Sequence, residues 1–269
     1  MLIRSIRPLV WPLAMPSIAT CLFAVIAVAQ DEPATPPGKI DQYKRPDQIA
    51  ADAFGPPPAA SAIAKTNLWI DRAAARVYCD GYVAMREGPL EMFACPAGTK
   101  EHESIVATIA RSKEVHTALL AVGATKGTPV RVIPDYLPAT GQRIRVWAAY
   151  RDAAGEFQCV DARQWILGRD DKTMDVDWVF AGSSLWTDPS DNTTYYQADG
   201  GDMICVSNFS TAMMDVPVAS PADASELIYR PKTDAIPPRG TPVRLILQPI
   251  PVPPAHPPAK PGADVLPAK

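Results

Sequence analysis

The sequence has no excess of positive charge, because 26 lysines and arginines stand against 29 aspartates and glutamates, for a formal net charge of -3. No global positive field therefore draws the chain to nucleic acid or to anionic lipid. Hydrophobic residues make up 47% and charged residues 20%, values close to the average for globular proteins. This composition excludes a wholly disordered, fibrous or multi-span membrane protein.

Familiar catalytic motifs are also missing. The sequence contains no phosphate-binding P-loop, dinucleotide fingerprint, Cys-x-x-Cys pair or G-x-S-x-G nucleophile elbow. Nucleotide chemistry, thioredoxin-type redox chemistry and elbow-type nucleophilic catalysis therefore have no support from motifs. Only three histidines are present, so the position of each one matters. No motif fixes a reaction, and whether the protein is an enzyme stays open.

Glycine is scarce beside proline, with 15 glycines against 30 prolines, and many prolines gather in residues 30–62 and 249–269. These segments show almost no aliphatic periodicity, so they cannot bury enough apolar surface to offset the entropy of ordering. We predict that both are disordered. The C-terminal segment favours extended polyproline II, and we prefer a solvated tail over a proline-motif ligand or a semi-rigid spacer.

Residues 1–29 are typical of a secretory signal peptide. Arg4 and Arg7 precede the apolar stretch 18–29, which ends in Ala-Val-Ala and is shorter than the ~20 residues of a membrane-spanning helix. We predict cleavage after residue 29, export to the periplasm or the medium, and no transmembrane anchor afterwards. Lipid attachment at Cys21 is disfavoured, because Thr20 precedes it and an apolar run follows.

Residues 63–248 show short alternating runs broken by turn signals. The pattern predicts one α+β domain, mainly antiparallel β, with one or two packed helices in two layers. The clearest helix covers 112–123, where Gly123 ends it. The predicted strands cover residues 66–70, 76–85, 90–95, 128–133, 143–150, 156–160, 176–180, 203–207, 226–230 and 243–248.

Four cysteines remain after the signal segment, at positions 79, 95, 159 and 205. In an oxidising compartment they allow three disulfide connectivities. If residues 76–85 and 90–95 form a hairpin centred on Glu87, Cys79 lies opposite Cys95 across the ladder. Cys79 and Cys95 are therefore the candidate disulfide. The alternatives are a free Cys95 thiol and a register shifted by one residue.

The segment after Cys95 is the densest in reactive side chains. Cys95, His102, Glu103 and His116 are the candidate ligands of a divalent metal, although their spacing matches no common zinc motif. Glu101 and Glu103 could act as acid and base if folding desolvates one of them. The plainer interpretation is a solvated turn at 100–103 and a core-lining His116, and we prefer it.

Three separated blocks, residues 86–105, 177–183 and 201–209, resemble in order the YdjY-domain family of exported bacterial proteins. The resemblance covers residues 68–247. It implies a signal peptide followed by one strand-rich domain, and it implies no particular reaction or ligand. It also gives a direction for the site, because two of the blocks carry most of the candidate residues and could converge in the fold.

Our leading hypothesis is an exported domain that binds a small ligand or a cell-envelope protein through the 100–104 loop and the strand end at 205–208. The second is a metal-binding protein or metal-dependent hydrolase that uses His102, Glu103 and His116, and the third is a structural cell-envelope protein. The candidate ligand-binding residues are Lys100, His102, Glu103, Ser104, Ser207 and Asn208.

Overall fold

The computed structural model describes residues 44–251 and 260–265. The predicted signal peptide, residues 30–43 of the first proline-rich segment, and residues 252–259 and 266–269 of the tail lie outside the described residues. In the described part of the chain, no helix is long and apolar enough to cross a membrane.

The described residues form two α-helices, fourteen strands and several 3-10 turns, which confirms the predicted sheet-rich α+β class. The helices are α1 (Pro46–Ala53) and α2 (Ser112–Ala121). The strands are β1 (Ser61–Ala64), β2 (Leu68–Asp71), β3 (Arg76–Val83), β4 (Met92–Pro96), β5 (Ser104–Thr108), β6 (Arg143–Arg151), β7 (Phe157–Asp161), β8 (Ile166–Leu167), β9 (Trp178–Val179), β10 (Leu185–Thr187), β11 (Thr194–Tyr196), β12 (Ile204–Cys205), β13 (Arg230–Pro231) and β14 (Pro242–Pro249). Two of the 3-10 turns matter for the site: η1 (Glu101–Glu103) and η4 (Thr233–Ala235).

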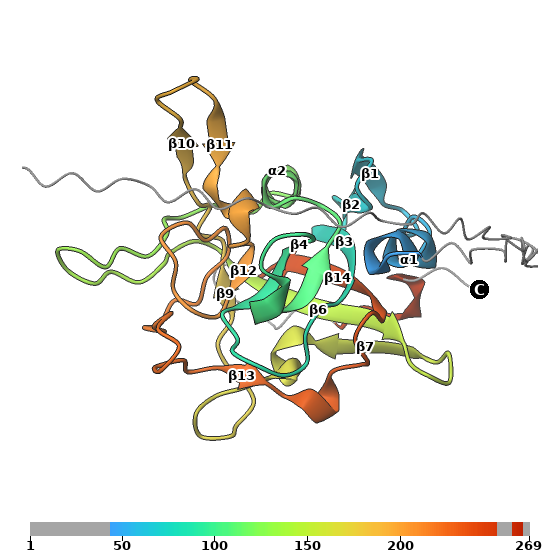
Figure 1. Cartoon of the computed structure of the whole chain (residues 1–269). Helices are drawn as coiled ribbons and strands as arrows, with labels where there is room; N and C mark the ends of the chain where they lie inside the picture. The colour runs from blue at the N-terminus through green and yellow to red at the C-terminus, as the bar shows by residue number, and fades with distance from the viewer. Residues whose placement is uncertain (1–43, 252–259, 266–269) are drawn as a thin grey trace, which may run out of the picture. The chain divides into compact units, whose positions relative to one another are not determined.

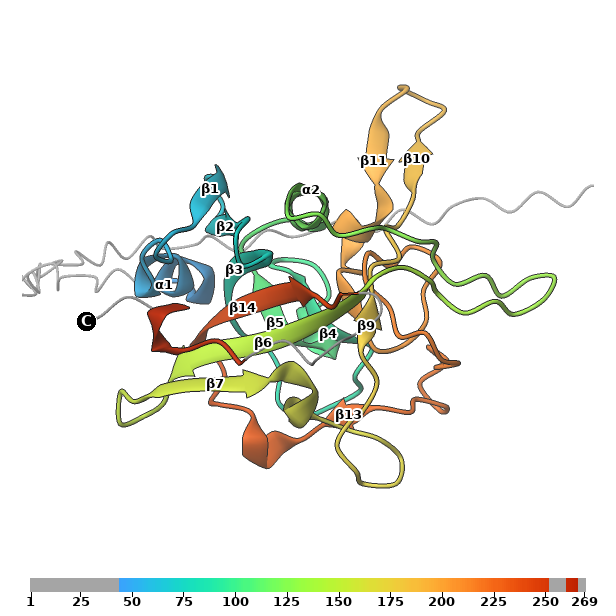
Figure 2. The same ribbon diagram turned by 180° about the vertical axis from the view of Figure 1, so that it is seen from behind.

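One large mixed sheet organises the domain (Figures 1 and 2). Its central path runs β12-β4-β5-β3-β14-β6-β7, with β2 also on β3, β1 on β2, and β9 on β6. The β4–β5 pair is parallel, and the other strand pairs of this sheet are antiparallel. The β10–β11 hairpin projects away from this sheet in both views.

The predicted hairpin of β3 with β4 is wrong, because β5 lies between them. Gly81 explains how β5 fits beside β3, since a Cβ atom there would stand 2.1 Å from the Ala107 carbonyl oxygen. The absence of a side chain allows this close backbone approach. β5 is buried along its whole length, so it lacks the alternation by which the other strands were predicted.

Both faces of the sheet are covered, which corrects the two-layer expectation. On one face, Val243, Leu245 and Leu247 join the main core cluster with Leu119 of α2. On the other face lies a second cluster, built from Phe54, Trp69, Tyr78, Trp147, Ile246 and Val265. A strand that is buried on both faces has apolar residues on each face. Successive residues of β14 therefore face two different apolar layers.

Several other predicted elements differ in the structure. The expected strand 128–133 is a loop with one isolated bridge, between Arg131 and Leu137, and Ile133 is 82% exposed there. The expected strand 226–230 shrinks to β13. Conversely, α1 lies inside segment 30–62, where composition predicted disorder, and Val265 of the tail is buried. The described parts of these two segments contact residues far away in the sequence, which local composition does not report.

Candidate functional site

The two candidate blocks, 100–104 and 201–209, lie side by side. Lys100 Nζ stands 3.0 Å from Asp202 Oδ1 and 3.4 Å from Glu103 Oε1. The same ammonium lies 4.6 Å from the ring centre of Phe209. Gly201 makes this approach feasible, because a Cβ atom there would meet the Lys100 stem at 2.5 Å. The convergence expected from the sequence is therefore observed.

Glu91, which precedes β4, links the same two blocks through its backbone. Its carbonyl accepts from the amides of Val206 and Ser207, and its own amide donates to the Glu103 carbonyl. Burial raises the pKa of the Glu91 carboxyl, and the nearby Glu103 carboxylate raises it further. Lys100 is thus held among several carboxylates in a partly buried place.

Lys100 is engaged by these internal partners. Burial alone would lower the pKa of Lys100, but the carboxylates of Asp202 and Glu103 outweigh that effect and raise it. The side chain is 28% exposed, and both of its ion-pair partners are exposed less than that. Charges arranged in this way stabilise the junction between the two blocks and leave little positive charge for a ligand.

Most of the other candidate ligand-binding residues are also satisfied inside the protein. Ser104 is buried and donates to the Lys100 carbonyl at 2.7 Å. Ser207 is buried as well. Asn208 donates to Asp215 Oδ1 at 3.1 Å and accepts from the backbone amide of Ser220 at 2.8 Å. Asn208 therefore joins parts of the 208–220 segment, and Ser104 closes the turn that begins at Lys100.

The four candidate metal ligands have different surroundings. His102 is 76% exposed, with Nε2 3.9 Å from Glu103 Oε2. His116 Nδ1 lies 2.7 Å from the Tyr196 hydroxyl, and burial followed by the charge of Lys126 lowers the pKa of His116. Cys95 is buried in a separate apolar cluster. In the described residues, no group of three metal-binding side chains could hold an ion.

The predicted Cys79–Cys95 bridge is wrong. Cys79 faces Leu68 and Leu245 in its ladders, whereas Cys95 pairs with Ala107 of β5. The two thiols belong to different buried clusters, and each described cysteine is free. The inserted β5 removes the register on which the bridge depended. Burial raises the pKa of the Cys79 thiol to about 12.

His102 lines an open cleft of about 430 Å³ on the surface. The cleft is formed by Ala84, Met85, Arg86, Glu87, Glu101, His102 and Arg239. Glu101 is fixed in its wall, because Oε1 accepts from the Tyr82 hydroxyl at 2.9 Å and from the Gly98 amide at 2.7 Å. Among the candidate ligand-binding residues, His102 is the one that faces this cleft.

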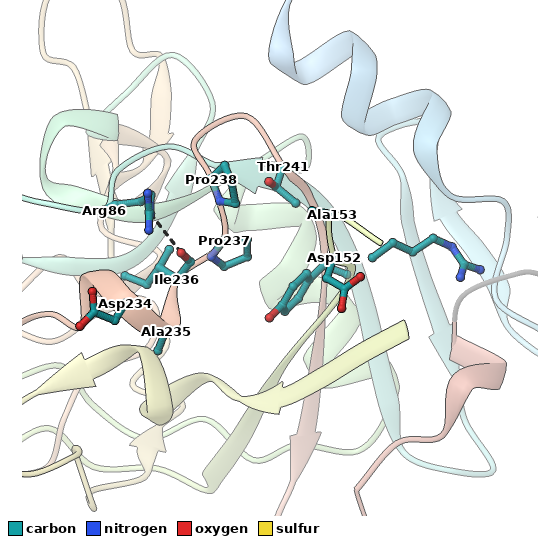
Figure 3. A pocket seen from close by; sticks show the side chains of 11 residues that line it. Arg86, Asp152, Ala153, Asp234, Ala235, Ile236, Pro237, Pro238 and Thr241 are labelled. Carbon is teal, nitrogen blue, oxygen red and sulfur yellow. Dashed lines mark hydrogen bonds between the residues drawn. The ribbon is translucent and has the colours of Figure 1, made fainter. Parts of the chain in front are cut away.

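A second cleft, of about 420 Å³, shares Arg86 with the first. Its lining residues are Arg86, Tyr150, Arg151, Asp152, Ala153, Asp234, Ala235, Ile236, Pro237, Pro238 and Thr241. Figure 3 shows Arg86 beside the 234–238 segment, with Asp152 across the cleft. Arg86 therefore lines both of these neighbouring clefts.

The guanidinium of Arg86 is held by backbone carbonyls. Nε donates to the Ile236 carbonyl at 3.0 Å (Figure 3). Nη2 donates to the Thr233 carbonyl at 2.9 Å. The Thr233 hydroxyl donates back to the Arg86 carbonyl at 2.9 Å. Within the described ranges, Arg86 forms no ion pair with a carboxylate.

Sequence reasoning missed Arg86 and Arg239 as site residues. It treated residues 86–88 as the turn of a hairpin, and η4, which fixes the Arg86 side chain, follows almost 150 residues later, at Thr233–Ala235. The signal that was available is the position of Arg86, at the start of the first family-like block. An arginine there, with no acidic partner at helical or cross-strand spacing, has to find its contacts elsewhere in the fold.

The model of the YdjY domain matches residues 68–248, which is more than half of the chain. No curated protein and no solved structure matches the chain.

Proposed function

The chain belongs to the YdjY domain family, and we propose that its domain is an exported binding module. In this proposal, a small ligand or a polar segment of a cell-envelope partner occupies the cleft beside the 100–104 loop. One observation carries the proposal: His102, the exposed candidate residue, lines an open polar cleft together with Arg86 and Arg239.

Two further features support binding at this place. The cleft walls are held by hydrogen bonds within the protein, at Glu101 on one side and at Arg86 on the other, so the site is formed before a ligand arrives. The residues that line it include no serine, threonine or cysteine that could act as a nucleophile. Export is supported by the signal pattern in residues 1–29.

Amide chemical shifts of the purified full chain would test the proposal, recorded by NMR during titration with N-acetylglycine, its uncharged amide and inorganic phosphate. We expect at least one of the three probes to shift residues that line the cleft. Because one hydrogen-bonding side chain is lost, His102→Ala should weaken that probe about two- to tenfold. The exposed Lys172→Ala, whose side chain lines a different hollow, is the matched control and should change nothing. Shifts confined to residues that do not line this cleft, or no shifts at all, would contradict the proposal.

A further inference from the structure

Resting on the proposed binding function, we infer that Arg86 is the recognition residue of the site and that the ligand presents it with a single carboxylate. The inference assigns a chemical class to the ligand and a role to a residue outside the candidate set. It is carried by the donors that Arg86 has left, by the way its side chain is fixed, and by the charges around it.

The first step concerns the donors. A guanidinium has five N–H groups in a planar fork. The structure uses two of them, from Nε to the Ile236 carbonyl and from Nη2 to the Thr233 carbonyl. The remaining donors are those of Nη1 and the second hydrogen of Nη2, at the far end of the group. That end matches the two oxygens of a carboxylate.

The second step concerns preorganisation. Both acceptors of the Arg86 side chain belong to the short stretch 233–236, and the Thr233 hydroxyl returns a bond to the Arg86 backbone. The guanidinium is thus held before a ligand binds, and less side-chain entropy is lost on binding. Carbonyl oxygens orient the group without neutralising it, so its charge stays available.

The third step concerns the surrounding charges. Arg239 lines the first cleft with Arg86 and Arg151 lines the second, but Glu87 lines the first cleft and Asp234 lines the second. Glu101 and Asp152 add negative charge, although both are engaged in hydrogen bonds within the protein. A positive fork between carboxylates attracts one negative charge and repels a second. The site therefore favours a monocarboxylate over a phosphate or another polyanion.

The titration described above tests the inference through the differences among its probes. N-acetylglycine should bind at the clefts that share Arg86, whereas N-acetylglycinamide, which differs in its uncharged end, should bind about tenfold more weakly. Phosphate should also bind more weakly than N-acetylglycine. Arg86→Lys keeps the charge but loses the fork, and should weaken N-acetylglycine about tenfold. Arg239→Gln should weaken it less.

Substitutions of Arg86 also remove its hydrogen bonds to the 233–236 segment, so a second variant tests the charge argument without changing Arg86. Glu87→Gln combined with Asp234→Asn removes two carboxylates and leaves Arg86 in place, so phosphate should gain affinity relative to N-acetylglycine by several-fold. Unchanged relative affinities would overturn the charge argument. Thermal unfolding of every variant shows whether its fold is retained.

The outcomes also separate this inference from the proposed function. Equal binding of N-acetylglycine and its amide in the clefts would overturn the carboxylate assignment and leave the binding module standing. Tighter binding of phosphate would overturn the preference for one charge. If none of the three probes shifts a residue of either cleft, both the inference and the proposed function fail.

Discussion

Two arginines of this domain show how differently one side chain can be used. Arg244 of β14 is fully buried, and its Nε and Nη2 pair with Asp80 Oδ1 and Oδ2 at 2.6 and 2.9 Å. Arg244 also donates to the carbonyls of Val265 and Gly55, at 2.8 Å each. The rings of Phe54 and Trp69 lie near its guanidinium, with centres at 5.2 and 4.8 Å. Arg86, by contrast, is half-buried and is oriented by two carbonyls alone.

Arg244 is a charge that holds the fold, whereas the charge of Arg86 remains available. Arg244 joins β14 to β3 through Asp80, to the segment that follows α1 through the Gly55 backbone, and to the tail through Val265. Its charge is compensated and most of its donors are used, so it acts as a structural centre. Arg86 has donors and charge left over at an open surface. A charged residue is a candidate for recognition when its internal partners orient it without neutralising it.

Lys100 of the predicted site resembles Arg244, because its charge is also compensated by carboxylates inside the protein. Lys100 is paired with Glu103 and Asp202, and its carboxylate partners are more buried than it is. The dense set of reactive side chains that attracted attention in the sequence therefore serves largely to join two blocks of the fold. Counting reactive residue types does not separate these cases, whereas counting the partners of each group does.

The largest expected effect comes from Arg244→Met, which would leave the Asp80 carboxylate buried without its cation. Breaking a buried pair in this way should lower the free energy of unfolding by about 3–5 kcal/mol. The matched variant Arg86→Met loses two hydrogen bonds to carbonyls and strands no charge, so it should cost about 1–2 kcal/mol. Urea denaturation of both variants measures the difference. Equal losses would remove the distinction between the two arginines.

A smaller effect is expected at Asp215, a buried carboxyl that can be compared with Asp80. Asp215 is fully buried; its Oδ1 accepts from the Val216 amide and the Asn208 side chain, whereas its Oδ2 has no hydrogen-bond partner within the described residues. Burial raises the pKa of Asp215 from 3.8 to about 7, with a smaller contribution from the negative charge of Asp202. Unlike Asp80, Asp215 has no cation paired with it in the described ranges.

The sign of the pH dependence follows from that shift. Between about pH 4 and pH 7, the folded state keeps a proton on Asp215 that the unfolded state releases, so stability falls as the pH rises through this window. Asp215→Asn cannot ionise and should remove on the order of 3 kcal/mol of this fall. The measurement is the free energy of unfolding at pH 4 and pH 8, with the exposed Asp135→Asn as control. An undiminished fall in the Asp215 variant would show that this carboxyl does not carry the dependence.

Much of the fold could be predicted from residue patterns. The alternation of Val243, Leu245 and Leu247 located β14, and Gly123 marked the end of the helical segment that contains α2. The same alternation places Arg244 on the opposite face of β14, and it gave no sign that this face is buried. In a sheet covered on one face only, Arg244 would be exposed to solvent. Phe54 and Gly55 after α1, Trp69 of β2 and Val265 cover it instead, and they come from segments far from β14 in the sequence. The fully buried β5 was not predicted for a related reason, because its apolar and polar residues do not alternate.

For the candidate site, the sequence indicated that the blocks carrying residues 100–104 and 205–208 could converge, but not the roles of their residues. Spacing cannot show that Lys100 and Asn208 are satisfied internally, because their partners come from other parts of the chain. Nor can it show that residues 233–236 return to orient Arg86. Contacts of this range are set by the packed fold and leave no local pattern.

The central claim is that Arg86 is available to a carboxylate and Arg244 is not. The most direct measurement follows the side-chain Nε–Hε signals of both arginines by NMR while N-acetylglycine is added to the full chain, with each signal assigned by its substitution to lysine. We predict a saturable shift of the Arg86 signal and no change at Arg244. A stationary Arg86 signal while cleft amides respond, or equal movement of both signals, would contradict the account.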